Sequence, residues 1–183
     1  MPEYRRIYTP GGIYFFTLVT YQRKKIFSQP CARSLFSDAV SHVRKYQPLT
    51  TIAHCILPDH IHLIWQMPED NFDYSKRIGA IKRHFSIKYC EQFNIHPPQN
   101  KTMIKRREVA IWQRRFWEHS IFDENDFEHH LNYLHFNPVK HGLVDRVQDW
   151  EASSFKDFVK QGYYDLDWGG NYRNVKPNQD FGE

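Results

Sequence analysis

The sequence predicts an α+β fold, a ferredoxin-like (split β-α-β) antiparallel sheet with helices packed on one face. The first observation behind this prediction is the order of hydrophobic periodicities, which is β-α-β-β-α-β-α along the chain. The second is that the first six of these elements follow the split β-α-β pattern. The third is length, because 183 residues are enough for one domain with a substantial core and do not require two.

The first half of the chain contains three expected strands and one helix. Residues 11–22 (GGIYFFTLVTYQ) are aromatic and β-branched after a glycine pair, which is typical of a strand. Residues 31–46 carry apolar side chains at helical spacing. The strand-like runs 49–57 and 61–67 follow closely on one another, so we expect them to pair as a hairpin.

The second half adds two helices and a strand. Helical spacing recurs at 74–93, whereas residues 94–108 are predicted to be a basic, proline-broken loop. Residues 109–122 (VAIWQRRFWEHSIF) resume strand character. Residues 123–136 are predicted to form the last helix of the fold.

Composition narrows the class of protein. The formal net charge of +4 indicates a modest attraction for polyanions. Three cysteines without a C-x-x-C pair favour a reducing compartment, and the apolar stretch at 11–22 is about half as long as a membrane span. We therefore expect a cytoplasmic protein with no membrane partner, signal peptide or anchor.

Two histidines, His60 and His62, stand one residue apart at the second strand of the expected hairpin. Alternate side chains of a strand share a face, so both imidazoles point one way while Ile61, Leu63 and Trp65 form a core face on the other side. The two rings are then close enough to share one metal ion. The alternative is a pair of solvated histidines on an open sheet face, and the spacing alone leaves both interpretations open.

The last expected helix begins at Asp123, a good N-cap, and carries Tyr133 and Asn137 on one face, four residues apart. Pro138 disfavours helical geometry at the preceding residue. We therefore expect the Asn137 amide oxygen at a frayed helix end, where it can turn toward a neighbouring site. The alternative is an ordinary amphipathic tyrosine followed by a C-terminal cap.

Five segments give the chain a more specific resemblance. They are YRRIYTPGGIYFFTLVT, LPDHIHLIW, IWQRRFWEH, NYLHFNPVKHGLV and GYYDLDWGG, in this order from about residue 4 to residue 170. Together they resemble the REP-associated tyrosine transposases, domesticated relatives of the single-tyrosine HUH transposases of insertion sequences. The resemblance implies an HUH endonuclease catalytic domain over 1–145, with 146–183 as a C-terminal extension that belongs to the same domain or is a tail.

Matching motifs assign roles to particular residues. The resemblance implies that His60 and His62 are the metal-binding histidines of the HUH motif and that Tyr133 is the nucleophile. In the insertion-sequence relatives a polar side chain one turn after the tyrosine completes the metal site, which corresponds to Asn137 here. The expected metal is Mg²⁺ or Mn²⁺, because magnesium prefers oxygen ligands whereas imidazole favours manganese.

These residue types suit the cleavage of a phosphodiester. A metal ion on a nonbridging oxygen stabilises the charge that develops in the transition state. Tyrosine, with an unperturbed pKa of about 10, is a better leaving group than an alkoxide and so suits a reversible covalent step. The resemblance implies a site-specific single-stranded DNA endonuclease and strand transferase that forms a 5′-phosphotyrosine. Its implied substrate is a REP-type DNA hairpin with a short flanking guide, and its implied state is a monomer or homodimer.

Cations interleaved with aromatic side chains are the candidates for DNA binding. The segment IWQRRFWEH places Arg114 and Arg115 beside Trp117, a mixture that suits single-stranded bases and backbone. The other candidates are Arg5, Arg6, Lys82, Arg83 and Lys140. The alternative is that these cations form solvated faces and that the tryptophan-rich segment is an amphipathic strand.

Two rival functions stay open at this point. One is a non-catalytic hairpin nucleic-acid-binding protein on the same scaffold, in which Tyr133 and both histidines are dispensable. The other is a metal-dependent hydrolase in which Tyr133 is a bystander. That hydrolase would need a carboxylate base, and Asp59, the residue before His60, is expected to point to the other face of the strand.

Overall fold

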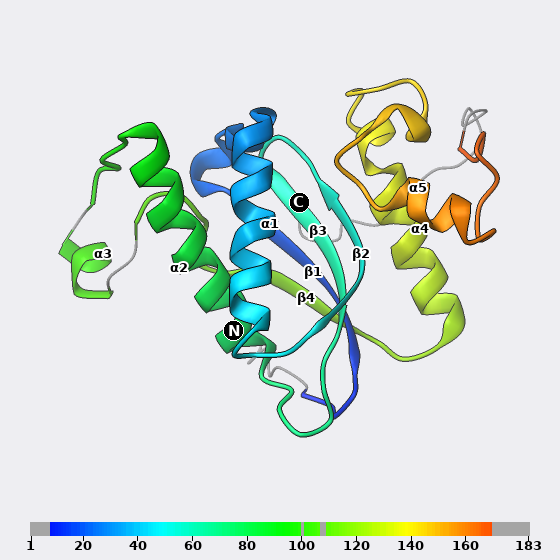
Figure 1. Ribbon diagram of the computed structural model, residues 1–183, viewed down its shortest axis with the longest axis horizontal. Coiled ribbons are helices and arrows are strands. Elements are labelled where there is room, and N and C mark those ends of the chain that lie inside the picture. Colours follow the sequence, from blue (N-terminus) through cyan, green and yellow to red (C-terminus); the bar gives the residue numbers. More distant parts are fainter. Residues whose placement is uncertain (1–7, 100, 107–108, 170–183) are drawn as a thin grey trace, which may run out of the picture.

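The computed structural model describes residues 8–99, 101–106 and 109–169 (Figure 1). Its strands are β1 (Ile13–Val19), β2 (Thr50–Ile56), β3 (His60–Gln66) and β4 (Trp117–Ile121). Its α-helices are α1 (Pro30–Arg44), α2 (Tyr74–Phe93), α3 (Lys101–Arg106), α4 (Glu124–Lys140) and α5 (Phe155–Lys160). The expected order β-α-β-β-α-β-α is confirmed, with α3 and α5 as short additions.

The four strands form one antiparallel sheet in the order β2-β3-β1-β4. Strand β1 pairs with β3 on one side and with β4 on the other, and β2 and β3 form the expected hairpin. In the register of the central pair, Thr17 of β1 lies opposite His62 of β3. The ferredoxin-like prediction is therefore confirmed, and the topology brings β1 beside a strand that is distant in sequence.

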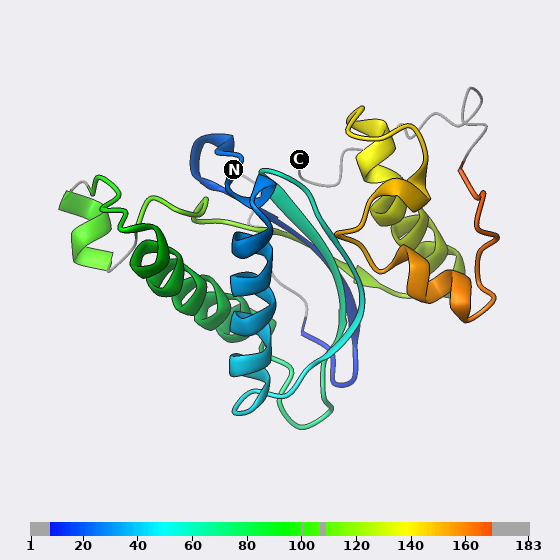
Figure 2. The same cartoon turned by 45° about the horizontal axis from the view of Figure 1, so that its top comes forward.

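Helices α1 and α2 cover one face of the sheet, as predicted for the split β-α-β elements (Figure 2). Alternate strand residues such as Phe16 and Leu63 enter this core. Helix α4 and the segment after it cover the other face, where Phe15, Leu131 and Phe155 belong to a second apolar cluster. The second layer forms because residues of β1 and β3 that alternate with the first set, such as Phe15 and Ile64, are also apolar and pack against α4.

The segment 109–122 is a strand only in its second half. Strand β4 begins at Trp117, whereas Ile111 and Trp112 are buried in the core under α1 and α2. The backbone around them still contacts the end of β1, because the N–H of Gln113 donates to the carbonyl oxygen of Val19 at 2.9 Å.

Helix α4 passes through Pro138 and ends at Lys140, so the prediction of a frayed end at Asn137 is wrong. Proline removes only one backbone donor, and the helix continues because the N–H of His141 donates to the carbonyl oxygen of Asn137 at 3.0 Å. Asn137 is completely buried. Its side chain is therefore held by the packed helix.

The segment after α4 returns to the sheet and covers the outer edge of β2. The N–H of Ile56 donates to the carbonyl oxygen of Ala152 at 2.8 Å, and the N–H of Ser154 donates to that of His54 at 2.9 Å. The hydroxyl of Ser154 also accepts from the N–H of His54 at 3.0 Å. These bonds satisfy backbone groups that an edge strand would otherwise expose.

In the part of the chain that the structure describes, no helix is both long and apolar enough to cross a membrane. The three cysteines are free thiols, with Cys31 exposed and Cys55 buried. Burial raises the pKa of the Cys55 thiol, so this side chain acts as a small apolar residue of the core.

Candidate active site

His60 and His62 lie side by side on the face of β3 that α4 covers. Their ring centroids are 4.9 Å apart. Both side chains are buried, with exposed fractions of 1% and 0%, so they are not solvated histidines on an open sheet face. Ile61, Leu63 and Trp65 point into the opposite core, as the alternation predicts.

A neighbouring side chain orients each imidazole. The Nδ1 of His60 lies 2.7 Å from Oδ1 of Asp59, and the Nδ1 of His62 lies 3.0 Å from the hydroxyl oxygen of Thr17. Because both Nδ1 atoms are engaged in this way, Nε2 is the atom through which each ring would bind a metal. A carboxylate behind a histidine, as Asp59 provides for His60, is a usual support of a metal ligand.

Asp59 therefore does not point to the other face, and that prediction is wrong. Asp59 precedes β3, so strand alternation does not apply to it, and its side chain folds back on the His60 ring. Burial alone would raise the pKa of the Asp59 carboxyl. The hydrogen bond and charge of His60, together with Arg23 at 3.4 Å, outweigh burial and lower this pKa. The carboxylate stays ionised beside His60.

Tyr133 faces the histidine pair from the middle of α4. Its ring centroid lies 5.4 Å from that of His62 and 6.1 Å from that of Phe15, and the residue is 6% exposed. The ammonium group of Lys140 donates to its phenolic oxygen at 3.1 Å and lies 4.7 Å from the ring centroid. The structure thus brings the predicted nucleophile, a predicted metal ligand and a predicted DNA-binding lysine together.

Asn137 and His141 lie on the same side of α4 as Tyr133. Asn137 is buried one turn after Tyr133. The ring centroid of His141 lies 5.3 Å from that of His60. His141 is the C-cap of α4, and the spacing 133, 137, 141 places all three residues on one side of the helix.

The donor set fits a divalent metal ion. His60 and His62 offer two imidazoles that are buried and backed by oxygen atoms, and Asn137 offers an amide oxygen. Two nitrogen donors and one oxygen donor suit manganese better than magnesium, which prefers an all-oxygen shell. Such an ion would lie between the sheet and α4.

The candidates for DNA binding that the structure describes lie on two different faces of the sheet. Lys82 on α2 donates to the carbonyl oxygen of Gln113 at 3.1 Å, which brings it near the exposed Arg114 and Arg115. Arg83 is also exposed on α2. Trp117, Lys140, Arg5 and Arg6 are the remaining candidates.

Trp117 and Lys140 belong to the other face of the sheet. Trp117 is half-buried and its ring centroid lies 5.8 Å from that of Phe15, while Lys140 contacts Tyr133. Arg5 and Arg6 lie outside the described residues.

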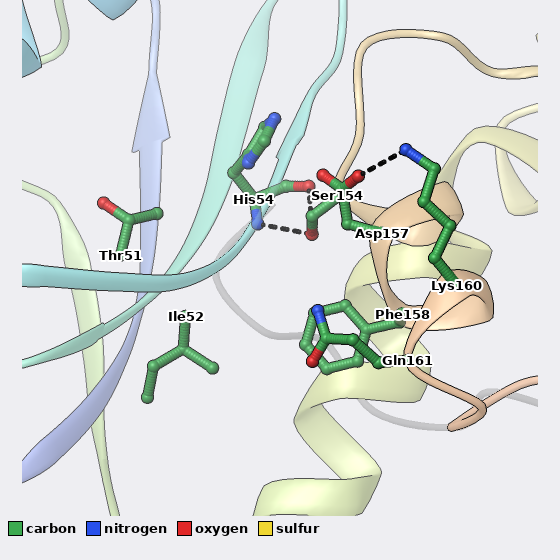
Figure 3. A pocket seen from close by; sticks show the side chains of 8 residues that line it. All are labelled: Thr51, Ile52, His54, Ser154, Asp157, Phe158, Lys160 and Gln161. Atoms are coloured by element: carbon green, nitrogen blue, oxygen red, sulfur yellow. Dashed lines mark hydrogen bonds and ion pairs between the residues drawn. The ribbon is translucent and has the colours of Figure 1, made fainter.

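A groove between β2 and α5 lies apart from the histidine pair and Tyr133 (Figure 3). Thr51, Ile52 and His54 line it from β2, and Asp157 and Lys160, which pair at 3.2 Å, line it from α5. None of the predicted site residues within the described ranges lines this groove. The chemistry that the sequence predicts is concentrated between the sheet and α4.

Comparison with known proteins gives the class. The family model described as "Transposase IS200 like" matches residues 10–137, which span all four strands and reach Asn137. The sheet, the histidine pair and the facing tyrosine thus belong to an IS200-like transposase.

Relatives that align with nearly the whole chain define the family more closely. A REP-associated tyrosine transposase of Haemophilus influenzae is 47% identical over 174 residues, covering 93% of this chain and 95% of the relative. One of Escherichia coli is 37% identical over 171 residues, covering 93% of each. A solved REP-associated tyrosine transposase bound to a REP hairpin is 34% identical with a TM-score of 0.76, covering 100% of this chain and 98% of that one. The chain belongs to the family of REP-associated tyrosine transposases.

Proposed function

We propose that this transposase is a metal-dependent, site-specific single-stranded DNA endonuclease and strand transferase that works through a 5′-phosphotyrosine. The observation that carries the proposal is the position of Tyr133, whose ring lies 5.4 Å from that of His62 and whose hydroxyl contacts Lys140 at 3.1 Å. A nucleophile beside two supported imidazoles is the arrangement that phosphoryl transfer needs.

The covalent step exchanges one phosphate ester for another. The phenol of Tyr133 releases its proton to solvent as its oxygen forms a bond to phosphorus. The bond from phosphorus to the 3′ oxygen breaks, and the released 3′ oxygen takes up one proton from solvent to become a hydroxyl. The 5′ end stays attached to Tyr133, and attack by a 3′-hydroxyl reverses the step. Lys140 stabilises the negative form of the phenolic oxygen as nucleophile and as leaving group.

The metal completes the site in this proposal. His60, His62 and Asn137 would hold Mn²⁺ or Mg²⁺, which when bound supplies Lewis-acid stabilisation of the charge that develops on the scissile phosphate. Asp59 and Thr17 hold the two rings in the ligating orientation.

The substrate that we propose is a REP-type DNA hairpin with a single-stranded flank. A relative of 34% identity has been solved with a REP hairpin, and the exposed Arg83, Arg114 and Arg115 of this chain suit phosphate contacts. The partly buried ring of Phe116, with the Lys82 ammonium 5.6 Å from its centroid, suits contact with an unpaired base. Binding should weaken as salt rises.

We further propose that one chain is sufficient for cleavage. Tyr133, His60 and His62 of the same chain form one cluster, so no residue from a second copy is needed to complete it. A monomer with its own tyrosine at its own histidines is therefore favoured over a homodimer with exchanged helices.

The test uses end-labelled hairpins with a single-stranded flank, incubated with protein and Mn²⁺ or Mg²⁺ and run on a denaturing gel. We expect a labelled, protease-sensitive adduct that chelator and Tyr133→Phe abolish. Tyr163→Phe, at a tyrosine that is 47% exposed, is the matched control and should leave the adduct unchanged. Cleavage that survives Tyr133→Phe would favour the hydrolase, and binding without cleavage in either metal would favour the non-catalytic hairpin-binding protein.

A further inference from the structure

Asp126, in the first turn of α4, bridges two imidazoles. Its Oδ2 accepts from Nε2 of His119 on β4 at 2.8 Å. Its Oδ1 lies 3.0 Å from Nδ1 of His130 on α4, and that nitrogen also donates to the Asp126 carbonyl oxygen at 2.8 Å. His130 is 3% exposed, so the bridge is fixed within the packed layer between β4 and α4.

Two histidines and a carboxylate are also a metal-ligand set, and their ligand atoms lie within 4.8 Å of one another. The ring geometry argues against an ion here. The two rings are stacked with centroids 4.4 Å apart and an interplanar angle of 17°. An ion bound by both rings would have to lie in both ring planes, which nearly parallel stacked rings do not permit. The cluster is therefore a hydrogen-bonded bridge between the sheet and the helix.

The bridge is connected to the proposed active site through Phe15. The ring centroid of Phe15 lies 5.0 Å from that of His130, 5.3 Å from that of His62 and 6.1 Å from that of Tyr133. Phe15 is completely buried, so it cannot move without displacing these rings. Asp126 and Tyr133 lie seven residues apart, about two turns of the same helix.

We propose that Asp126 is a positioning residue for Tyr133. By bonding to His119 and His130 together, it sets the rotation and height of α4 on the sheet and so the distance between Tyr133 and the histidine pair. The inference rests on the proposed function, because the distance that it controls is that of the proposed covalent step. Displacement of a reacting group by about 1 Å can slow a reaction about 100-fold.

The test compares Asp126→Asn with Asp123→Ala, a change at the N-cap of the same helix that removes no side chain of the bridge. The Asp123 carboxylate accepts from the N–H of Asp126 at 2.8 Å, so its loss weakens α4 without removing a bond to an imidazole. The measurements are the single-turnover rate of adduct formation, the Kd for the hairpin and the Tm of each variant.

We expect Asp126→Asn to slow adduct formation roughly tenfold or more, with the hairpin Kd changed by less than about twofold. Asp126→Glu, which keeps a carboxylate able to accept from both imidazoles, should recover most of the rate. Asp123→Ala should lower the Tm and leave the rate within about twofold of the parent protein. Equal rates for Asp126→Asn and Asp123→Ala at the same Tm loss would overturn the inference, as would a loss of rate that Glu does not recover.

A second readout does not depend on activity. The fluorine resonance of 3-fluorotyrosine placed at position 133 should shift in Asp126→Asn and stay unchanged in Asp123→Ala. If the parent protein forms no tyrosine-dependent adduct, the proposed function fails, and the resonance still decides the positioning. An identical resonance in both variants would overturn the role of Asp126 whatever the activity.

Discussion

The ammonium nitrogen of Lys140 lies 3.1 Å from the phenolic oxygen of Tyr133, seven residues earlier on the same helix. An exposed lysine near a DNA-binding site would ordinarily be assigned to a phosphate. The contact instead directs its charge at the atom that we propose as nucleophile. We therefore propose that Lys140 contributes to the covalent step more directly than to the binding of DNA.

We expect Lys140→Met to slow adduct formation about 10- to 100-fold. This is at the lower end of the rate losses that follow removal of one positioned hydrogen-bond donor or charge. The hairpin Kd should change little, because one exposed cation contributes a small part of phosphate binding. Rates at saturating hairpin, measured beside Lys160→Met as a control on α5, separate the two effects. A weaker Kd with an unchanged rate would return Lys140 to DNA binding.

Asp59 gives a prediction about metal affinity. Replacing its carboxylate by an amide removes the negative charge behind His60 and weakens the hydrogen bond that orients the ring, so Asp59→Asn should raise the Mn²⁺ concentration for half-maximal cleavage about 10- to 100-fold. The maximal rate in excess metal should recover substantially. The measurement is a metal titration of adduct formation, with Glu91→Gln on α2 as the control carboxylate. Identical titrations for Asp59→Asn and the parent protein would contradict the role of Asp59.

Because His135 is buried, we expect the free energy of unfolding to decrease in acid. Burial, and to a smaller extent the nearby His54, lowers the pKa of His135 from 6.5 to about 3 in the folded protein. The unfolded chain therefore binds more protons between these values, and stability falls as pH decreases through this window, by roughly 1.4 kcal/mol per pH unit for this group.

Urea unfolding from pH 7 to pH 4 tests this expectation. His135→Gln should flatten the dependence on pH, whereas His129→Gln, at an exposed position of α4, should retain it. Burial also lowers the pKa of His54 and of His130, so some slope should persist in the His135 variant. A slope that His135→Gln leaves unchanged would refute the assignment.

The extension from residue 146 gives a prediction about domain organisation. We propose that it belongs to the same domain as 1–145, because Phe155 lies in the same buried cluster as Leu131 of α4. Phe155→Ala should lower the free energy of unfolding by about 3 to 5 kcal/mol, whereas Phe122→Ala, at a residue that is 76% exposed, should cost under about 0.5 kcal/mol. Cooperative unfolding of 1–145 alone with the parent Tm would refute this proposal.

The elements of the fold follow from local signals that the sequence displays. Residues 74–93 were expected to be a helix and α2 has these bounds, because Asp73 caps its start through the N–H of Lys76 and Asn94 adopts the left-handed conformation after its end. The position of the His60 and His62 side chains on the same face of β3 likewise follows from strand alternation. Such features depend on residues that are neighbours in the sequence.

The features that could not be predicted from the sequence depend on contacts between elements that are distant in the chain and meet only in the folded protein. Strand alternation gave the wrong direction for Asp59 because it says nothing about a side chain in the turn before a strand. The effect of Pro138 was overestimated because the packing of α4 outweighs one missing backbone bond. The bridge of Asp126 to His119 requires β4 to lie against the start of α4, which no periodicity reveals.

The bonds from residues 152–154 to the outer side of β2 restrict how two copies of this protein can associate. Because the backbone groups of His54 and Ile56 that face away from β3 are already engaged, a second molecule cannot add a strand to the sheet at this position. A continuous intermolecular sheet through β2 is therefore blocked in the folded protein, and self-association must use another surface. The same segment that completes the core thus also protects this edge of the sheet from pairing with another chain.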